Sequence, residues 1–502
     1  MNFKEIPFVR LAEIEIDTDA ARLLGYEYAL RFFALPVSLT GDFLRVAVCE
    51  PENFGIISHL ADITGKIILP LAVEENDLKF YINNIFAEEE IDSIASRFLA
   101  RLKDNKAGTE ISEELLVEIS AAPAVQLIDS LIESAVLKRA SDIHIEPFGK
   151  KLRARFRVDG ELITYNNVDI SLHSNVISRL KIMGGMDISE KRMPQDGSFS
   201  KEIDGQTIDF RLSTLPTTNG EKAVIRLLYN QKTRLKKNEL GFFEDDLEHL
   251  TTLFTRPFGA IFMTGPTGSG KSTTLNCFLE ELNEETKNII TVEDPVENPI
   301  PGISHVNVER HTLTFAGALR HILRQDPDII MIGEIRDEET ARIAISAAIT
   351  GHVVLSTLHT NDAAGVIERL SDMGIEPYFA AAALNGVISQ RLVRRICCEC
   401  SAETSLTPHA ARILSIPPDT PVRHGTGCVH CNFTGFHTRF AIYEYIIMTE
   451  ETRRQMVADP AGFAATIRKR DNLRKNAIRS LKAGFTTAEE IIRVLNRDGE
   501  NE

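Results

Sequence analysis

Gly265-Pro-Thr-Gly-Ser-Gly-Lys-Ser-Thr273 decides the fold of this chain, because it fits the pattern G-x-x-x-x-G-K-[ST] in full. The apolar residues before it, Ala260 to Met263, predict a strand that runs straight into the loop. Lys271 begins a predicted helix, whose apolar residues recur every three or four positions. A strand, a glycine-rich loop and a helix in this order predict a phosphate-binding loop at the edge of a parallel sheet.

The loop has the chemistry that a nucleotide needs. Its glycines let backbone N–H groups approach phosphate oxygens, and the helix N-terminus adds a positive dipole end. We expect Lys271 to reach the β- and γ-phosphates of ATP and the Ser272 hydroxyl to ligate Mg²⁺. The predicted nucleotide-binding residues are Gly265, Pro266, Thr267, Gly268, Ser269, Gly270, Lys271, Ser272 and Thr273.

Two further apolar runs end in acids. Asp328 to Glu334 has the form of a Walker B strand, and Ile289 to Asp294 carries Glu293 near its end. Carboxyl ends of parallel strands share one sheet edge, so both acids are expected beside the P-loop. One would hold Mg²⁺ through water and the other would orient or deprotonate the attacking water. Which acid is the base stays open, and a plain surface acid at a strand end is the alternative.

A third strand and several arginines complete the catalytic candidates. Val353 to Asp362 ends in polar residues, and His359 is expected to sense the γ-phosphate, although a single histidine is more often structural. Arg211 and Arg226 precede the P-loop and can reach an ATP on the next domain or subunit, as arginine fingers do. Arg153, Arg155 and Arg157 also alternate along one strand, where a solvated face is the better interpretation.

Five of the seven cysteines fall between Cys397 and Cys431. Cys397-x-x-Cys400 and Cys428-x-x-Cys431 together offer four thiolates, the set that suits tetrahedral Zn²⁺. With all four positions filled by protein, the zinc would be structural. Cys398 is left over without an assigned role. Reduced cysteines around a loop, or a redox pair, are the alternatives.

Composition and charge limit the classes of partner that this chain is expected to bind. The 502 residues predict three or four domains, and the formal charge of -16 argues against direct nucleic-acid binding. Residues 451–482 hold nine Lys or Arg against three Asp or Glu, which suggests either an acidic partner or a solvated helix face.

The uncharged run from Ile343 to Asn361 is too polar to cross a bilayer, and the N-terminus lacks the apolar core of a secretory signal. We therefore expect a cytoplasmic chain.

The chain is predicted to have six parts. Residues 1–88 form a small α/β domain, with helical periodicity from Ala20 to Phe33, and residues 89–121 form a linker with a helical start. A second α/β domain with hairpins spans 122–237, and alternating strands and helices over 238–392 form the P-loop domain. The zinc-binding module covers 393–434, and a mainly helical part covers 435–502. The fold class is therefore α/β.

These motifs together resemble one family, the GspE/PilB-type secretion and pilus-assembly ATPases, from about Ala122 to Val494. Besides the P-loop and the cysteine pairs, the resemblance rests on the following stretches: Ala140-Ser-Asp-Ile-His-Ile-Glu-Pro147, Gln195-Asp-Gly197, Ser213-Thr-Leu-Pro-Thr217, Gly220-Glu-Lys222, Thr291-Val-Glu-Asp-Pro-Val-Glu297, Leu323-Arg-Gln-Asp-Pro-Asp328, Gly333-Glu-Ile-Arg-Asp337, Ser356-Thr-Leu-His-Thr-Asn-Asp362 and Thr486-Thr-Ala-Glu-Glu490. The sequence departs from the family pattern at His437, Thr438 and Ala441, where glycine-containing stretches are usual.

The resemblance implies a RecA-like ATPase core preceded by a PAS-like domain that contributes arginines. It implies a homo-hexamer with ATP at domain and subunit boundaries, near Arg211, Arg226, Arg320 and Arg336. It also implies a cytoplasmic motor that lies peripheral to the inner membrane, on a membrane platform and cytoplasmic docking proteins. The cysteine pairs and the compact N-terminal domain favour type II secretion. The alternatives are a pilus-assembly motor, a pilus motor that serves DNA uptake, or a nucleotide switch without hydrolysis.

Overall fold

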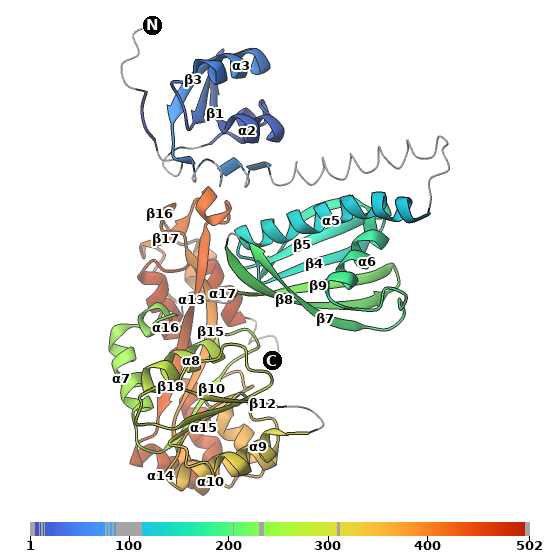
Figure 1. The fold of residues 1–502 in the computed structure, drawn as a ribbon. Coiled ribbons are helices and arrows are strands. Elements are labelled where there is room, and N and C mark those ends of the chain that lie inside the picture. Colours follow the sequence, from blue (N-terminus) through green and yellow to red (C-terminus); the bar gives the residue numbers. More distant parts are fainter. Residues whose placement is uncertain are drawn as a thin grey trace. The chain divides into compact units, whose positions relative to one another are not determined.

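The computed structural model describes residues 6–9, 11, 14, 16–75, 78, 81–82, 85–86, 113–203, 205–229, 235–308 and 312–496 (Figure 1). The chain divides into two compact units. The first contains residues 1–230 and 427–434, and the second contains residues 231–426 and 435–502.

The second unit is built on a seven-stranded sheet in the order β12-β11-β13-β14-β10-β15-β18. The first six strands pair in parallel, and β18 lies antiparallel to β15 at one edge. In chain order the strands are β10 Gly259–Thr264, β11 Ile289–Glu293, β12 Ser304–Asn307, β13 Ile329–Ile332, β14 Val353–Leu358, β15 Leu384–Ile396 and β18 Phe436–Ile447. The central strands β10, β13 and β14 are buried throughout, as expected for a parallel sheet covered on both faces.

Helices cover both faces of this sheet. Successive residues of β10 point to opposite sides: Phe262 belongs to one apolar core, and Ile261 and Met263 belong to the other. The helices are α7 Glu244–Phe254, α8 Lys271–Leu282, α9 Phe315–Ile322, α10 Glu338–Ile349, α11 Gly365–Asp372, α12 Pro377–Ala383, α13 Pro408–Leu414, α14 Glu450–Ala458, α15 Pro460–Lys469, α16 Asn472–Lys482 and α17 Ala488–Asn496. This arrangement confirms the predicted α/β class with a P-loop core and a helical C-terminal part.

A smaller core joins the C-terminal helices to the end of the sheet. Val393 of β15 and Phe440 of β18 pack with Leu481 of α16 and Ile491 of α17. The short strands β16 Ser401–Thr404 and β17 Val422–Gly425 form a separate antiparallel pair beside this core. In the chain, the cysteine-bearing residues 397–431 thus lie between β15 and β18.

In the first unit, a six-stranded antiparallel sheet has the order β6-β5-β4-β9-β8-β7. Its strands are β4 Asp142–Phe148, β5 Lys151–Val158, β6 Glu161–Asp169, β7 Gln195–Ile203, β8 Gln206–Thr217 and β9 Gly220–Tyr229. Helices α5 (Glu113–Leu137) and α6 (His173–Met183) share one apolar core with the sheet. Hairpins were predicted for this part of the chain, and one of them joins β5 to β6 through a turn at Asp159-Gly160. Asp204, between β7 and β8, lies outside the described residues.

The N-terminal part has its own core and a three-stranded sheet in the order β1-β2-β3. Its elements are α1 Thr18–Arg22, α2 Tyr26–Phe32, β1 Ala34–Thr40, β2 Phe43–Val48, α3 Phe54–Thr64 and β3 Ile67–Ala72. The helix expected from Ala20 to Phe33 is two short helices, because Gly25 adopts a φ of +74° that a helix cannot continue through.

The predicted linker is only partly described. Residues 89–112 lie outside the described residues, and 113–121 already belong to α5. No helix within the described segments combines the length and hydropathy needed to cross a bilayer.

Candidate nucleotide and metal sites

The predicted catalytic side chains follow neighbouring strands of one parallel sheet. The P-loop follows β10, His359 follows β14, Glu334 follows β13, and Glu293 ends β11. These strands are adjacent in the order β11-β13-β14-β10. Because parallel strands share their carboxyl edge, all four features lie along the same edge, as the sequence predicted.

The P-loop backbone requires its glycines. Gly265, Gly268 and Gly270 have φ values of +138°, +78° and +85°, which other residues rarely adopt. A Cβ on Gly265 would also lie 2.4 Å from the carbonyl oxygen of Gln390, and one on Gly270 would lie 2.8 Å from Gln390 Nε2. The loop therefore depends on glycine both for its conformation and for its close approach to β15.

Lys271 is a buried cation, 7% exposed, whose Nζ donates to the carbonyl oxygens of Gly265 at 2.8 Å and Pro266 at 3.0 Å. Burial lowers its pKa, the positive charge of Arg391 lowers it further, and the negative charge of Glu334 acts in the opposite direction. The hydroxyl of Ser269 is buried and has no hydrogen-bond partner among the described residues. A buried cation and an unsatisfied hydroxyl in a glycine-rich loop fit a phosphate ligand.

Strand β15 supports the loop from behind. The side chain of Gln390 is 2% exposed, and its Nε2 donates to the Ser269 carbonyl oxygen at 2.8 Å. Its Oε1 accepts from Thr274 Oγ1 of α8 at 3.0 Å. Arg391, 3% exposed, donates to the carbonyl oxygen of Asn361 beyond β14. Gln390 and Arg391 were not predicted from the sequence, although polar residues inside an otherwise apolar strand can indicate such a role.

Glu334 is held by two side chains. It accepts hydrogen bonds from Arg336 and from His359 Nε2, the latter at 3.1 Å. Burial by itself would raise the pKa of Glu334, but the hydrogen bonds from Arg336 and His359 outweigh it and lower the pKa. Glu334 is therefore kept as a carboxylate. His359 is 49% exposed and touches this acid, which brings two of the predicted catalytic residues together.

Glu293 has different partners. Its Oε1 accepts from Thr291 Oγ1 at 2.7 Å and lies 3.2 Å from His305 Nδ1. A Cβ on Gly333 would lie 3.4 Å from the Cα of Glu293, so the ends of β11 and β13 pack closely. His305 was not predicted, because it lies in no recognised motif and meets Glu293 only through the pairing of β11 with β12.

The predicted arginines belong to the other unit. Arg211 of β8 and Arg226 of β9 are directly opposite each other in an antiparallel pair and so share one face of that sheet. Arg226 Nε donates to Asp142 at 3.0 Å. On the same sheet Arg153 and Arg155 both donate to Glu146. A contact of Arg211 or Arg226 with a nucleotide stays a prediction.

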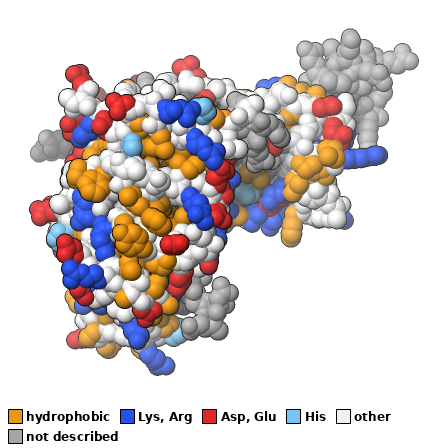
Figure 2. Space-filling model, turned by 90° about the horizontal axis from the view of Figure 1, so that it is seen from below, with side chains coloured by type: hydrophobic (Ala, Val, Ile, Leu, Met, Phe, Trp, Pro, Cys, Tyr) orange, Lys and Arg blue, Asp and Glu red, His pale blue; other side chains and the backbone are white. Residues whose placement is uncertain are grey.

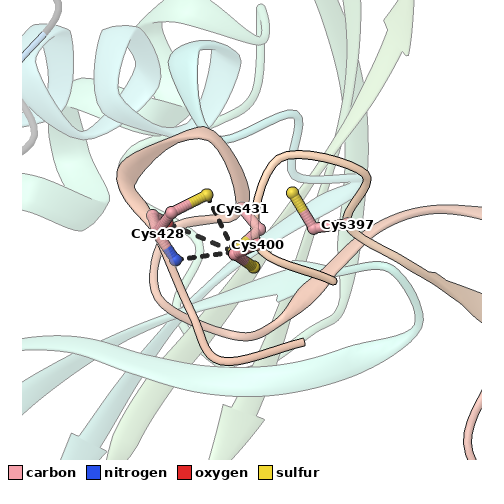
Figure 3. Close-up of side chains that lie close together, drawn as sticks. All are labelled: Cys397, Cys400, Cys428 and Cys431. Atoms are coloured by element: carbon pink, nitrogen blue, oxygen red, sulfur yellow. Dashed lines mark hydrogen bonds between the residues drawn. The ribbon is translucent and has the colours of Figure 1, made fainter. Parts of the chain in front are cut away.

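The four predicted zinc ligands lie together (Figure 3). The sulfur atoms of Cys397, Cys400, Cys428 and Cys431 all lie within 4.8 Å of one another. A tetrahedral site with Zn–S bonds of about 2.3 Å requires sulfur pairs about 3.8 Å apart. The observed Sγ–Sγ distance between Cys428 and Cys431 is 3.7 Å. The donor set therefore fits zinc, and the exposed Cys398 is outside it.

Two arginines of the basic segment 451–482 form close ion pairs within the unit. Arg468 contacts Asp362 and Glu368, both at 2.7 Å, and Arg479 contacts Asp245 at 2.7 Å. On the face drawn in Figure 2, acidic and basic side chains are interspersed with apolar ones. For these two arginines the pairing favours the solvated helix face over an acidic partner.

A cavity of about 330 Å³ lies away from the P-loop, between α7, β18 and α16. Four of its lining residues bond to one another: Tyr443 and Tyr445 donate to Asp246, which also accepts from Arg479. It therefore lacks the unsatisfied groups that mark the P-loop.

Comparison with known proteins adds independent findings. Residues 118–493 match the family described as Type II/IV secretion system protein, and residues 5–92 match the MshEN domain. The type IV pilus assembly ATPase PilB of Myxococcus xanthus (strain DK1622) is 39% identical over 97% of this chain and 88% of its own length. The type II secretion system ATPase E of Vibrio cholerae serotype O1 is 43% identical over 76% of this chain and 77% of its own length.

Among solved structures, the ATPase DotB of Legionella pneumophila covers 74% of this chain and 95% of its own, with a TM-score of 0.54 and 22% identity. At this identity the likeness speaks for the fold alone.

Proposed function

The chain belongs to the Type II/IV secretion system protein family, and on that premise we propose that it is an ATP-hydrolysing motor that powers protein secretion through a type II secretion system. The resemblance read from the sequence motifs is thereby confirmed. The observation that carries the proposal is the sheet edge where the P-loop, Glu334 and His359 follow three adjacent strands. The relative from Vibrio cholerae, named a type II secretion system ATPase, supports the cellular role.

In the proposed site, Lys271 and the P-loop amides bind the ATP phosphates. The Ser272 hydroxyl and one of the two carboxylates, Glu334 or Glu293, would hold Mg²⁺, and this ion would supply positive charge at the phosphates. The other carboxylate orients the attacking water or accepts its proton. His359 Nε2 lies 3.1 Å from Glu334, and His359 would sense the γ-phosphate through this contact.

We further propose that the active form is a homo-hexamer at the cytoplasmic side of the inner membrane, held there by platform and docking proteins. The exposed Arg226, together with Arg211, would then complete a nucleotide site in the assembly. The four-cysteine cluster would hold a structural zinc. The division into six parts that the sequence predicts remains our proposal for the domain organisation, with residues 1–88 as the part that docks a partner.

Replacing Lys271 with Ala tests the enzymatic proposal. We expect loss of ATP turnover, because the loop loses the cation that meets the β- and γ-phosphates. Lys287→Ala is the control: Lys287 lies in the same unit and pairs with Glu284 on the surface. Turnover that persists in the Lys271 variant at the level of the control would refute the proposal.

Type IV pilus assembly is the second candidate, favoured by a specific observation. The pilus-assembly relative aligns over nearly the whole chain, whereas the type II relative aligns over about three quarters of it. Deleting the gene in its host separates the two roles. Loss of secreted proteins with surface pili retained supports secretion, and loss of pili with secretion retained supports pilus assembly.

A further inference from the structure

The tautomer of His305 is set by its backbone neighbour. His305 lies in the edge strand β12 and is 12% exposed. The backbone N–H of Ile300 donates to His305 Nε2 at 2.9 Å. A backbone N–H can only donate, so Nε2 must carry a lone pair, and the neutral ring then carries its hydrogen on Nδ1.

The Nδ1–H of His305 points into a cluster that ends on Glu293. His305 Nδ1 lies 2.7 Å from Thr291 Oγ1, and Thr291 Oγ1 lies 2.7 Å from Glu293 Oε1. The direct distance from His305 Nδ1 to Glu293 Oε1 is 3.2 Å. Thr291 and His305 are register partners in the parallel pair β11–β12, so the sheet itself brings them to one face. A consistent set of donors therefore runs from the ring through the hydroxyl to one carboxylate oxygen.

The two candidate acids, Glu334 and Glu293, accept hydrogen bonds from different kinds of donor. Glu334 accepts from Arg336, a cation, and from His359. Glu293 accepts from a hydroxyl and a neutral imidazole on a single oxygen. Neutral donors fix the direction of a carboxylate without cancelling its charge. The arrangement at Glu293 thus orients its carboxyl group through uncharged donors.

We propose that His305, acting with Thr291, is a positioning residue that orients Glu293 for the hydrolytic step. This inference rests on the proposed function, because it assigns a task within the same nucleotide site. A purely structural alternative exists, in which His305 serves only to fix the segment before β12 through Ile300. The two roles use different ring nitrogens, Nδ1 for Glu293 and Nε2 for Ile300, so substitutions can separate them.

The matched pair is His305→Ala and His305→Asn. The Asn amide can place a donor near the former Nδ1 but does not reach Ile300, whereas Ala removes both contacts. Each is measured in the full-length assembled protein, alone and combined with Glu293→Gln. The readouts are kcat, KM for ATP, and the affinity for a non-hydrolysable ATP analogue.

We expect His305→Ala to lower kcat about tenfold with KM and analogue affinity within about twofold, because a misdirected carboxylate slows chemistry rather than binding. His305→Asn should recover most of that loss. In the Glu293→Gln background, His305→Ala should cause no further decrease in kcat. Equal losses in both backgrounds, a raised KM with unchanged kcat, or no recovery by Asn would each overturn the inference.

A readout independent of turnover separates this inference from the proposed function. Thermal midpoints are compared for the Asn and Ala variants, alone and with Glu293→Ala. The Asn variant should melt higher than the Ala variant only when Glu293 is present. A difference of the same size without Glu293 would refute the contact, whereas an unmodified chain that hydrolyses no ATP would refute the proposed function instead.

Discussion

Gln390 binds the backbone of Ser269 from behind the P-loop, with its Nε2 donating to the Ser269 carbonyl oxygen at 2.8 Å. The same side chain accepts from Thr274 Oγ1 at 3.0 Å and so joins the loop to the first turn of α8. All three side chains are at most 3% exposed. The side-chain amide of Gln390 therefore positions both the P-loop and the first turn of α8, which together form the predicted phosphate site.

Gln390→Leu should weaken nucleotide binding. The substitution keeps the size of the side chain but leaves two buried polar groups without partners, each at a cost of about 1–3 kcal/mol. We expect a roughly tenfold lower affinity for ADP, measured by calorimetry, together with a lower thermal midpoint. Gln325→Leu is the control, because Gln325 is exposed in the same unit. An ADP affinity equal to that of the unmodified chain would contradict the role of Gln390.

The features that could be predicted are those carried by contiguous sequence. The strand, loop and helix around Lys271 lie within about 25 residues, and each acid comes at the end of its own apolar run. The spacing of the cysteine pairs likewise predicts the four metal ligands. The 27 residues between the pairs, however, did not predict the two short strands found there. Local patterns therefore gave the phosphate loop, both acids and the metal cluster.

The residues that were missed act across long separations in the chain. Gln390 lies 121 residues from Ser269, and their contact exists only because β15 is placed beside β10. His305 reaches Glu293 through strand pairing, 12 residues away, with no motif to mark it. At Gly25 the prediction was wrong for a local reason. The apolar periodicity from Ala20 to Phe33 predicted one helix, but Gly25 adopts a backbone conformation that only glycine adopts readily and that ends the helix.

Glu334→Gln should abolish most turnover and preserve ATP binding. The amide cannot accept charge-assisted hydrogen bonds from Arg336 in the same way, nor can it ligate a cation or accept a proton as a carboxylate does. We expect kcat to fall by roughly 100-fold or more, the range typical of an acid–base residue. Steady-state turnover and binding of a fluorescent ATP analogue measure the two effects. The exposed Glu285→Gln, in the same unit, is the control.

The lowered pKa of Glu334 also predicts a pH profile. Because hydrogen bonds from Arg336 and His359 hold this pKa below its usual 4.5, Glu334 stays ionised from pH 5.5 upward. Any loss of turnover on acidification from pH 8 to 5.5 must then come from another group. A Glu334→Asp variant should show the same acidic limb as the parent chain, and a limb that moved with this substitution would contradict the assignment.

Removal of one cysteine ligand should release the metal and loosen residues 397–431. Cys428→Ser replaces one of the four thiolates of the cluster, whereas Cys398→Ser changes only an exposed neighbour. We expect about one zinc per chain in the parent and in the Cys398 variant, and a large loss in the Cys428 variant. Metal analysis after gel filtration measures this. Proteolysis within the segment should rise in parallel, and equal zinc in both variants would exclude the four-thiolate site.

Glu490 of α17 stabilises the C-terminal region through a buried ion pair. The side chain is 2% exposed and accepts from Arg394 at 2.5 Å and from Arg493 at 2.8 Å. Burial alone would raise the pKa of Glu490, but the hydrogen bonds from Arg493 and Arg394 outweigh it and lower the pKa to about 2. The folded state therefore holds this carboxylate ionised at a pH where the unfolded chain has begun to take up protons.

The sign of the pH dependence follows from that difference. A group whose pKa falls from the usual 4.5 to about 2 on folding stabilises the protein fully above pH 4.5 and loses this contribution as the pH falls toward 2. Glu490→Gln should thus cost about 3 kcal/mol at pH 7, and the difference from the parent should shrink steadily between pH 4.5 and 3. Guanidinium unfolding at pH 7, 4.5 and 3 measures it. Glu489→Gln, an exposed neighbour in the same helix, should have little effect at any pH, and a Glu490 penalty independent of pH would show that the ion pair is not its source.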